Sequence, residues 1–245
     1  MHISACDAGR LLPNCKGERV VKIVSWNCNG KFREKFHHIL ALNADIYVIQ
    51  ECEDPARTDC IAYKDFARNY LWTGENRNKG LGVFARRGLS LKITDQPSFC
   101  LRYFLSINVD DRFDLVAVWA CKPYIEEYYD YQRINISNYN EKTVIIGDFN
   151  SNVIWDKKHS IRTHSAVVQQ LDALGICSAY HHRYGETQGN ESTPTFCLYR
   201  HPDKGYHIDH CFTNPKNILD YRVMHSSDWL KTSDHIPILL ETTWP

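Results

Sequence analysis

The sequence predicts an α/β protein in which two β-sheets pack face to face and helices cover their outer faces. Three observations support this prediction. Strand-like and helix-like segments alternate in the first third of the chain, strand-like segments follow one another directly in the middle, and strand-like segments return near the C-terminus. A purely parallel, doubly wound sheet fits less well, because parallel neighbours need crossover helices that the middle segments lack.

The first part of the chain alternates between the two kinds of segment. Residues 20–26 (VVKIVSW) and 45–50 (DIYVIQ) are rich in β-branched and aromatic side chains and predict strands. Between them, residues 32–44 place Phe, Ile and Leu near helical spacing, which predicts a helix. Residues 80–87 (GLGVFARR) predict another strand, which follows a loop rich in Gly and Asn.

Two strand-like segments follow each other in the middle of the chain. Residues 99–109 (FCLRYFLSINV) and 113–120 (FDLVAVWA) predict antiparallel strands joined by a turn at 110–112. Residues 126–140 look helical, and residues 142–147 (KTVIIG) predict the next strand.

The last third begins with an amphipathic pattern at residues 164–175, which predicts a helix that ends at Gly175. It then returns to β-branched and aromatic patterns, and the strands predicted from them cover residues 193–200, 206–214, 219–225 and 236–242.

The composition is that of a globular protein that is neither strongly basic nor acidic. The 245 residues contain 43% apolar and 24% charged residues, and the 29 Lys and Arg balance the 29 Asp and Glu. A zero net charge gives no global sign of nucleic-acid binding, although a local basic face can exist within it. No linker or repeat divides the chain, so we expect an irregular arm at residues 1–19 and a single catalytic domain at residues 20–245.

The ten cysteines lack the C-x-x-C pairs of a zinc site. Most lie in apolar runs, so we expect reduced core thiols rather than a disulfide framework. The N-terminus has no apolar signal region, and no window approaches the length of a membrane span. We therefore expect a soluble, cytoplasmic protein without a membrane partner, and we favour a monomer.

Polar side chains recur where predicted strands end. A carboxylate, an amide or an imidazole lies beside β-branched core residues at five boundaries, which carry Asn27, Glu51, Asp148 with Asn150, Asp209, and Asp234 with His235. Each alone has a plain structural explanation as a turn residue, a solvated strand end or a hydrogen-bonded core histidine. Rigid sheets also hold catalytic groups on such loops. Their joint occurrence favours catalysis, with a turn at Gly147 projecting Asp148 and Asn150.

The chemistry of these side chains suits hydrolysis of a phosphodiester. Glu51, Asp234 and Asn27 offer oxygen ligands, which suit Mg²⁺, Mn²⁺ or Ca²⁺ better than zinc. Asp209 can fix the tautomer of His235 and stabilise its protonated form. Asp148 can orient or deprotonate a water molecule, and an amide such as that of Asn150 can donate to a developing oxyanion.

Five segments resemble the successive motifs of the endonuclease/exonuclease/phosphatase superfamily, which includes deoxyribonuclease-I-like and exonuclease-III-like enzymes. They read SWNCNG, DIYVIQE, GDFNSN, HIDHCF and SDHIPI, occur in the order typical of that family, and extend from Asn27 to His235. The resemblance implies a four-layered αββα sandwich of two mixed sheets flanked by helices. It also implies hydrolysis of phosphoesters that depends on Mg²⁺ or Mn²⁺.

Site roles follow from the same resemblance. Glu51 resembles the principal metal ligand, and Asn27 and Asp234 look like its companions. Asp148 resembles the residue that positions the attacking water, and Asn150 the amide that contacts the phosphate. His235 looks like the imidazole at the scissile phosphate, with Asp209 as its partner.

One position departs from the family pattern. Where the family usually has a His or Tyr near the phosphate, this chain has Trp119, whose indole donates a hydrogen bond but cannot exchange a proton. Three explanations stay open: Trp119 acts only as a donor, Lys122 or Tyr124 serves nearby, or the position belongs to the core.

Two basic segments favour a nucleic acid, DNA or RNA, as the substrate. Residues 75–87 carry Arg77, Lys79, Arg86 and Arg87, and residues 155–164 carry Lys157, Lys158 and Arg162 beside Trp155. Such clusters bind backbone phosphates, and an indole can stack on a base. Solvated loops with no binding role explain the same charges. Trp119, Lys122, Arg77, Arg162 and Trp155 are the candidate substrate-binding residues.

Two other functions stay open. The protein could hydrolyse a small soluble phosphate ester, because fold does not select a substrate. It could instead be a catalytically silent nucleic-acid-binding module. The second is disfavoured because all seven site positions carry side chains able to perform their roles.

Overall fold

Two six-stranded mixed sheets form the centre of the protein in a computed structural model that describes residues 20–94 and 101–243. The predicted arm at 1–19 lies outside the described residues. The first sheet has the order β13 (Ile218–Val223), β14 (Ile238–Thr243), β1 (Val20–Asn27), β2 (Ile46–Cys52), β4 (Lys79–Ala85) and β3 (Tyr70–Asn76). The second has the order β5 (Leu91–Ile93), β6 (Phe104–Val109), β7 (Phe113–Trp119), β8 (Thr143–Asp148), β12 (Asp209–Thr213) and β9 (Cys177–Ser178).

The two sheets repeat one pairing pattern. Each has a parallel pair at its centre, β1 with β2 in the first sheet and β7 with β8 in the second. All other neighbours in both sheets are antiparallel. The predicted antiparallel pairing of the two middle strands, β6 and β7, is confirmed.

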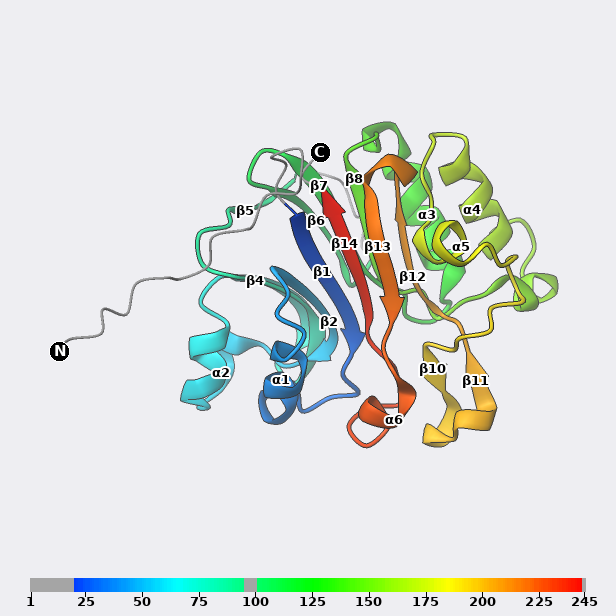
Figure 1. The fold of residues 1–245 in the computed structure, drawn as a ribbon. Coiled ribbons are helices and arrows are strands. Elements are labelled where there is room, and N and C mark those ends of the chain that lie inside the picture. The colour runs from blue at the N-terminus through cyan, green and yellow to red at the C-terminus, as the bar shows by residue number, and fades with distance from the viewer. Residues whose placement is uncertain (1–19, 95–100, 244–245) are drawn as a thin grey trace.

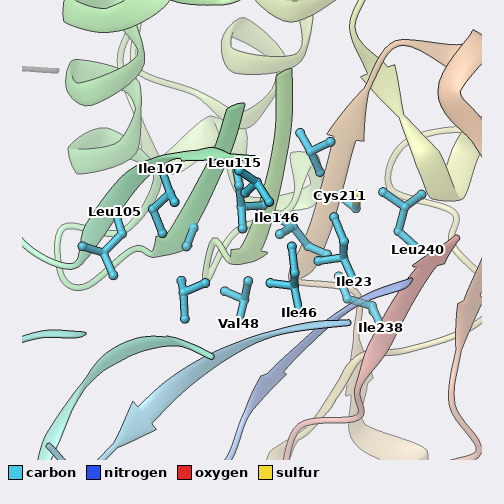
Figure 2. Packing of buried hydrophobic residues seen from close by; sticks show 14 of the residues in the cluster. Ile23, Ile46, Val48, Leu105, Ile107, Leu115, Ile146, Cys211, Ile238 and Leu240 are labelled. Atoms are coloured by element: carbon cyan, nitrogen blue, oxygen red, sulfur yellow. The ribbon is translucent and has the colours of Figure 1, made fainter. Parts of the chain in front are cut away.

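An apolar core fills the space between the sheets. Buried side chains from both inner faces meet there, among them Ile23 and Ile46 from the first sheet and Leu115 and Ile146 from the second (Figure 2). Central strands are buried on both faces, which explains why they read as nearly continuous apolar runs in the sequence.

Helices cover the outer faces, which gives four layers (Figure 1). Side chains of α1 (Phe32–Leu40), α2 (Ile61–Phe66) and α6 (Ser226–Trp229) join an apolar cluster on the first sheet. Side chains of α3 (Ile125–Asn135) and α4 (His164–Asp172) join a cluster on the second. The predicted αββα sandwich is confirmed.

Several elements differ from the sequence expectation. Only residues 196–197 of the predicted strand at 193–200 are extended, as β10 (Phe196–Cys197), which pairs with β11 (Gly205–Tyr206). The chain leaves the strand because Tyr199 and Arg200 adopt left-handed backbone conformations, with φ of 55° and 60°. Several short elements were not expected, among them α2, α5 (Ala179–Tyr184), α6 and the edge strand β3.

All seven cysteines in the described part of the chain are free thiols. Four of them, Cys28, Cys52, Cys197 and Cys211, are buried, and the other three are partly exposed. Across residues 20–94 and 101–243, no helix combines the length and the apolar character that a membrane crossing requires.

Candidate active site

Asp148 and Asp209 lie side by side at the ends of two neighbouring strands of the second sheet. They are direct partners in the antiparallel pairing of β8 with β12, and both are buried. Residues paired across two strands point to the same face of a sheet. Two carboxylates are therefore buried next to each other. Buried negative charges of this kind need hydrogen-bond donors and a positive charge close by to stabilise them.

Gly147 does not form the turn that the sequence suggested. The strand β8 continues through it to Asp148, and Gly147 is paired with Val118 on one side and His210 on the other. A Cβ atom on Gly147 would lie 1.9 Å from the carbonyl oxygen of Val118. Glycine is thus required by the close approach of β7 to β8, beside the carboxylate of Asp148.

Two asparagines hold the Asp148 carboxylate. Asn27 Nδ2 donates to Asp148 Oδ2 at 2.9 Å, and Asn150 Nδ2 donates to the same oxygen at 3.0 Å. The Asn150 backbone N–H donates to Asp148 Oδ1 at 2.9 Å, which fixes the tight turn after β8, where Asn150 has a left-handed φ of 47°. Asn27 belongs to the first sheet and Asp148 to the second, so this carboxylate joins the two sheets.

His235 completes the group from the segment that precedes β14. Its Nδ1 lies 2.9 Å from Asp209 Oδ2, and its Nε2 lies 3.9 Å from Asp148 Oδ2. Burial by itself lowers the pKa of His235, but the carboxylates of Asp209 and Asp148 outweigh burial and raise that pKa. Burial raises the pKa of Asp148, and the imidazolium opposes that rise.

Three residues that the sequence did not single out hold these groups in place. Ser233 Oγ donates to the backbone oxygen of Asn27 at 2.7 Å and accepts the N–H of His235 at 3.0 Å. Thr195 Oγ1 accepts the N–H of Asp209 at 2.9 Å. The ring of Phe196 lies 4.8 Å from that of His235. Ser233 stands directly before the Asp-His pair, so its position in the sequence was the only available signal.

Glu51 lies inside β2 rather than after it. The pairing of β2 with β4 shifts between Gln50 and Cys52, so that Glu51 is the extra residue of a β-bulge with a left-handed φ of 62°. Bulges redirect side chains next to active sites. The carboxylate receives a long hydrogen bond from Asn27 Nδ2 at 3.4 Å, and its Oε2 lies 3.0 Å from Lys79 Nζ.

The residues expected to bind a metal fit a hard divalent cation. Asn27, Glu51 and Asp234 present only oxygen ligands around the end of β1, where Asn29 Nδ2 donates to Asp234 Oδ1 at 2.9 Å. The Lys79 ammonium group beside Glu51 indicates that this position attracts a cation. Asp148, Asp209 and His235 form a second group, each with one ligand atom within 4.8 Å of the others.

The five candidate substrate-binding residues lie in different surroundings. Trp155 borders a cavity beside Asn150, and Trp119 is nearly buried on β7, at the position paired with Asp148. Lys122 is exposed in the turn after β7. Arg77 borders a separate charged pocket with Arg33 and Asp54, and Arg162 forms ion pairs with Glu126 and Asp130.

A cavity of about 450 Å³ opens next to the buried carboxylates. Four aromatic side chains form much of its wall, and a lysine and an asparagine also line it. These residues are Trp155, Tyr206, Phe196, Tyr124, Lys158 and Asn150. The rings of Trp155 and Tyr206 lie 5.3 Å apart, and Lys158 Nζ lies 6.0 Å from the Trp155 ring. The cavity combines flat apolar surfaces with a positive charge.

Comparison with solved structures shows the same fold at low sequence identity. The 3′ phosphatase NExo from Neisseria, bound to a product DNA hairpin, matches with a TM-score of 0.68 at 20% identity, over 91% of this chain and 100% of that chain. An AP endonuclease from Archaeoglobus fulgidus matches with a TM-score of 0.62 at 17% identity, over 90% and 98% of the two chains. The AP endonuclease LMAP from Leishmania major matches with a TM-score of 0.65 at 12% identity, over 93% and 89%.

No curated protein matches the sequence. A family model, described as the Endonuclease/Exonuclease/phosphatase family, matches residues 24–235, which include all seven residues placed around the buried carboxylates and the end of β1. This chain belongs to the Endonuclease/Exonuclease/phosphatase family.

Proposed function

We propose that the protein is a divalent-metal-dependent phosphodiesterase that hydrolyses DNA or RNA. The observation that carries the proposal is the buried pair Asp148 and His235, held by Asn27, Asn150 and Asp209. Asn150 and Phe196, which contact this pair, also line an aromatic cavity. Family membership supports phosphoester hydrolysis, and the similar solved structures, a 3′ phosphatase bound to a product DNA hairpin and an AP endonuclease, agree with it.

The protein side of the reaction follows from the hydrogen bonds. Asp148 accepts the proton of a water molecule, because Asn27 and Asn150 fix its carboxylate and burial raises its pKa, which makes it a stronger base. The Asp209 carboxylate orients His235 through Nδ1, which leaves Nε2–H free to donate to a phosphate oxygen. A Mg²⁺ or Mn²⁺ ion at Glu51, Asp234 and Asn27 would supply Lewis acidity and neutralise phosphate charge.

Asn150 must give up one of its present hydrogen bonds before its side chain can donate to the substrate phosphate. Its Nδ2 already donates to Asp148 Oδ2 and, at 3.2 Å, to the backbone oxygen of Ala120. Donation to a phosphate oxygen therefore replaces the bond to Ala120, because the bond to Asp148 holds the catalytic carboxylate.

The cavity favours a nucleotide over other phosphoesters. Bases stack on Trp and Tyr rings with little regard to sequence, and Lys158 is placed to meet a backbone phosphate. A cavity of this size would also accept a small aromatic phosphate ester, which is the second candidate.

A substrate panel tests the proposal. Purified protein is incubated with Mg²⁺ or Mn²⁺ and single-stranded DNA, duplex DNA, RNA, nucleotides or inositol phosphates, with Asp148→Ala as the inactive control. We expect metal-dependent cleavage of a nucleic acid by the wild type and none by the variant. Cleavage restricted to small esters would favour the second candidate, and no turnover at all would favour a silent binding module.

A further inference from the structure

Lys79, at the start of β4, lies between the Glu51 carboxylate and the indole of Trp119. Its Nζ atom is 3.0 Å from Glu51 Oε2 and 5.5 Å from the centroid of the Trp119 ring. Half of the lysine side chain is exposed, whereas Glu51 is only 18% exposed. The ammonium group therefore sits at the solvent entrance of the site and covers a carboxylate that belongs to the proposed metal ligands.

The indole under Lys79 is a fixed surface. Trp119 is 6% exposed, and its ring packs against Tyr103 with 4.5 Å between centroids. Its strand position is paired with Asp148, so the indole is anchored beside the catalytic carboxylate. An aromatic face attracts an ammonium group, which helps to keep a released lysine side chain nearby.

A divalent ion on Glu51 competes with the lysine for the carboxylate. The ion and the Lys79 ammonium group, now 3.0 Å from Oε2, would repel each other across it. The lysine stem has four flexible carbons and a half-exposed position, so the ammonium group can leave Oε2 at little cost. A bound substrate phosphate is then the anion nearest to the Trp119 face.

We propose that Lys79 is a second cation of this site, which neutralises Glu51 until a divalent ion binds and then contacts the substrate phosphate from the face of Trp119. The proposal rests on the proposed function. It also accounts for the tryptophan at a position where the resemblance leads one to expect a His or Tyr: the indole positions a positive charge instead of supplying a hydrogen-bonding group to the phosphate.

Manganese binding without substrate tests the first half of the proposal. Mn²⁺ affinity is measured by titration calorimetry for the wild type, Lys79→Met and Lys79→Arg. Lys79→Met removes the cation that competes with Mn²⁺ for Glu51. Because a partly exposed ion pair is weak, we expect Mn²⁺ affinity to rise by only about three- to tenfold in this variant, and to stay near the wild-type value in Lys79→Arg. The matched control is Lys92→Met. Lys92 is an exposed lysine on β5 whose Nζ lies 2.9 Å from Asp111 Oδ1, and its replacement should leave Mn²⁺ affinity unchanged.

Binding of inorganic phosphate to the Mn²⁺-loaded protein tests the second half. We expect affinity to fall about tenfold in Lys79→Met and to return in Lys79→Arg. Unchanged Mn²⁺ affinity in Lys79→Met would overturn the competition, and unchanged phosphate affinity would overturn the phosphate contact. A wild-type protein that cleaves no phosphoester would refute the proposed function alone, because the Mn²⁺ titration of the variant does not depend on turnover.

Discussion

The replacement of Gly147 by alanine tests whether the contact between β7 and β8 sets the position of Asp148. The added Cβ would lie 1.9 Å from Val118 O and 2.7 Å from its carbonyl carbon, whereas real Cβ contacts stay above 3.0 Å. The two strands must therefore separate by about 1 Å or more. Val118 O cannot simply turn away, because it accepts a buried hydrogen bond from Gln50 Nε2 at 3.2 Å.

We expect Gly147→Ala to lower the free energy of unfolding by about 1–3 kcal/mol, the usual cost of overpacking. We also expect kcat/KM for phosphodiester hydrolysis to fall about 10²-fold, because a displacement of about 1 Å at a catalytic group has an effect of that size. Urea unfolding followed by tryptophan fluorescence measures the first effect. Initial rates at a temperature where the variant is fully folded measure the second.

Ile145→Val is the matched control, since it removes one methyl group on the same strand but from the outer cluster beneath α3 and α4. It should cost about 0.5–1.5 kcal/mol of stability and leave kcat/KM almost unchanged. Wild-type stability and rate in Gly147→Ala would refute the reasoning. An equal loss of activity in Ile145→Val would show that activity follows stability and not the position of Asp148.

The remaining predictions concern buried charges. Asp148→Ala and His235→Ala should each lower the hydrolysis rate by about 10²–10⁴-fold while thermal unfolding stays cooperative; near-normal turnover in either would contradict its role. Glu51→Gln should raise the Mg²⁺ concentration for half-maximal rate by about tenfold or more, and an unchanged titration would count against Glu51 as a ligand. Burial lowers the pKa of His164 to about 4 and that of His210 below its usual range, so the unfolded chain binds protons below about pH 6.5 that the folded chain does not. The lowered pKa of buried His207 adds to this effect, whereas the raised pKa values of Asp148 and His235 oppose it. A net loss of about 1 kcal/mol is expected in urea unfolding from pH 6.5 to 5.5, and a gain in stability on acidification would exclude it.

The sequence was most informative where burial restricts residue type. Strands such as β1 and β8 are buried on both faces and read as β-branched runs. The edge strand β3 is partly or fully exposed along its whole length, so its sequence, YLWTGEN, shows no alternation, and it was not predicted. The helix α2 has six residues and no side-chain cap, which leaves too short a pattern to detect.

Some site residues also left a pattern in the sequence, whereas others depend on the fold alone. Asp209 was noticeable because an aspartate inside a strand-like run is unusual, and it lies beside Asp148. The bulge at Glu51 and the ion pair of Glu51 with Lys79 depend on the left-handed backbone conformation of Glu51. No local sequence pattern predicts that conformation. The cavity wall depends on a hairpin, β10 with β11, that brings Phe196 and Tyr206 next to Trp155.

The division of the site between two sheets has a consequence for how the protein tolerates mutation. Asn27 and Glu51 come from the first sheet, and Asp148 and Asp209 come from the second. The thickness of the apolar layer between the sheets therefore sets the spacing of the chemical groups. In a mutational scan, substitutions in the two outer clusters should reduce only the amount of folded protein, whereas volume changes in the central layer should also lower the turnover of each folded molecule. Sequence drift in this family is thus expected to be slower in the central layer than beneath the helices.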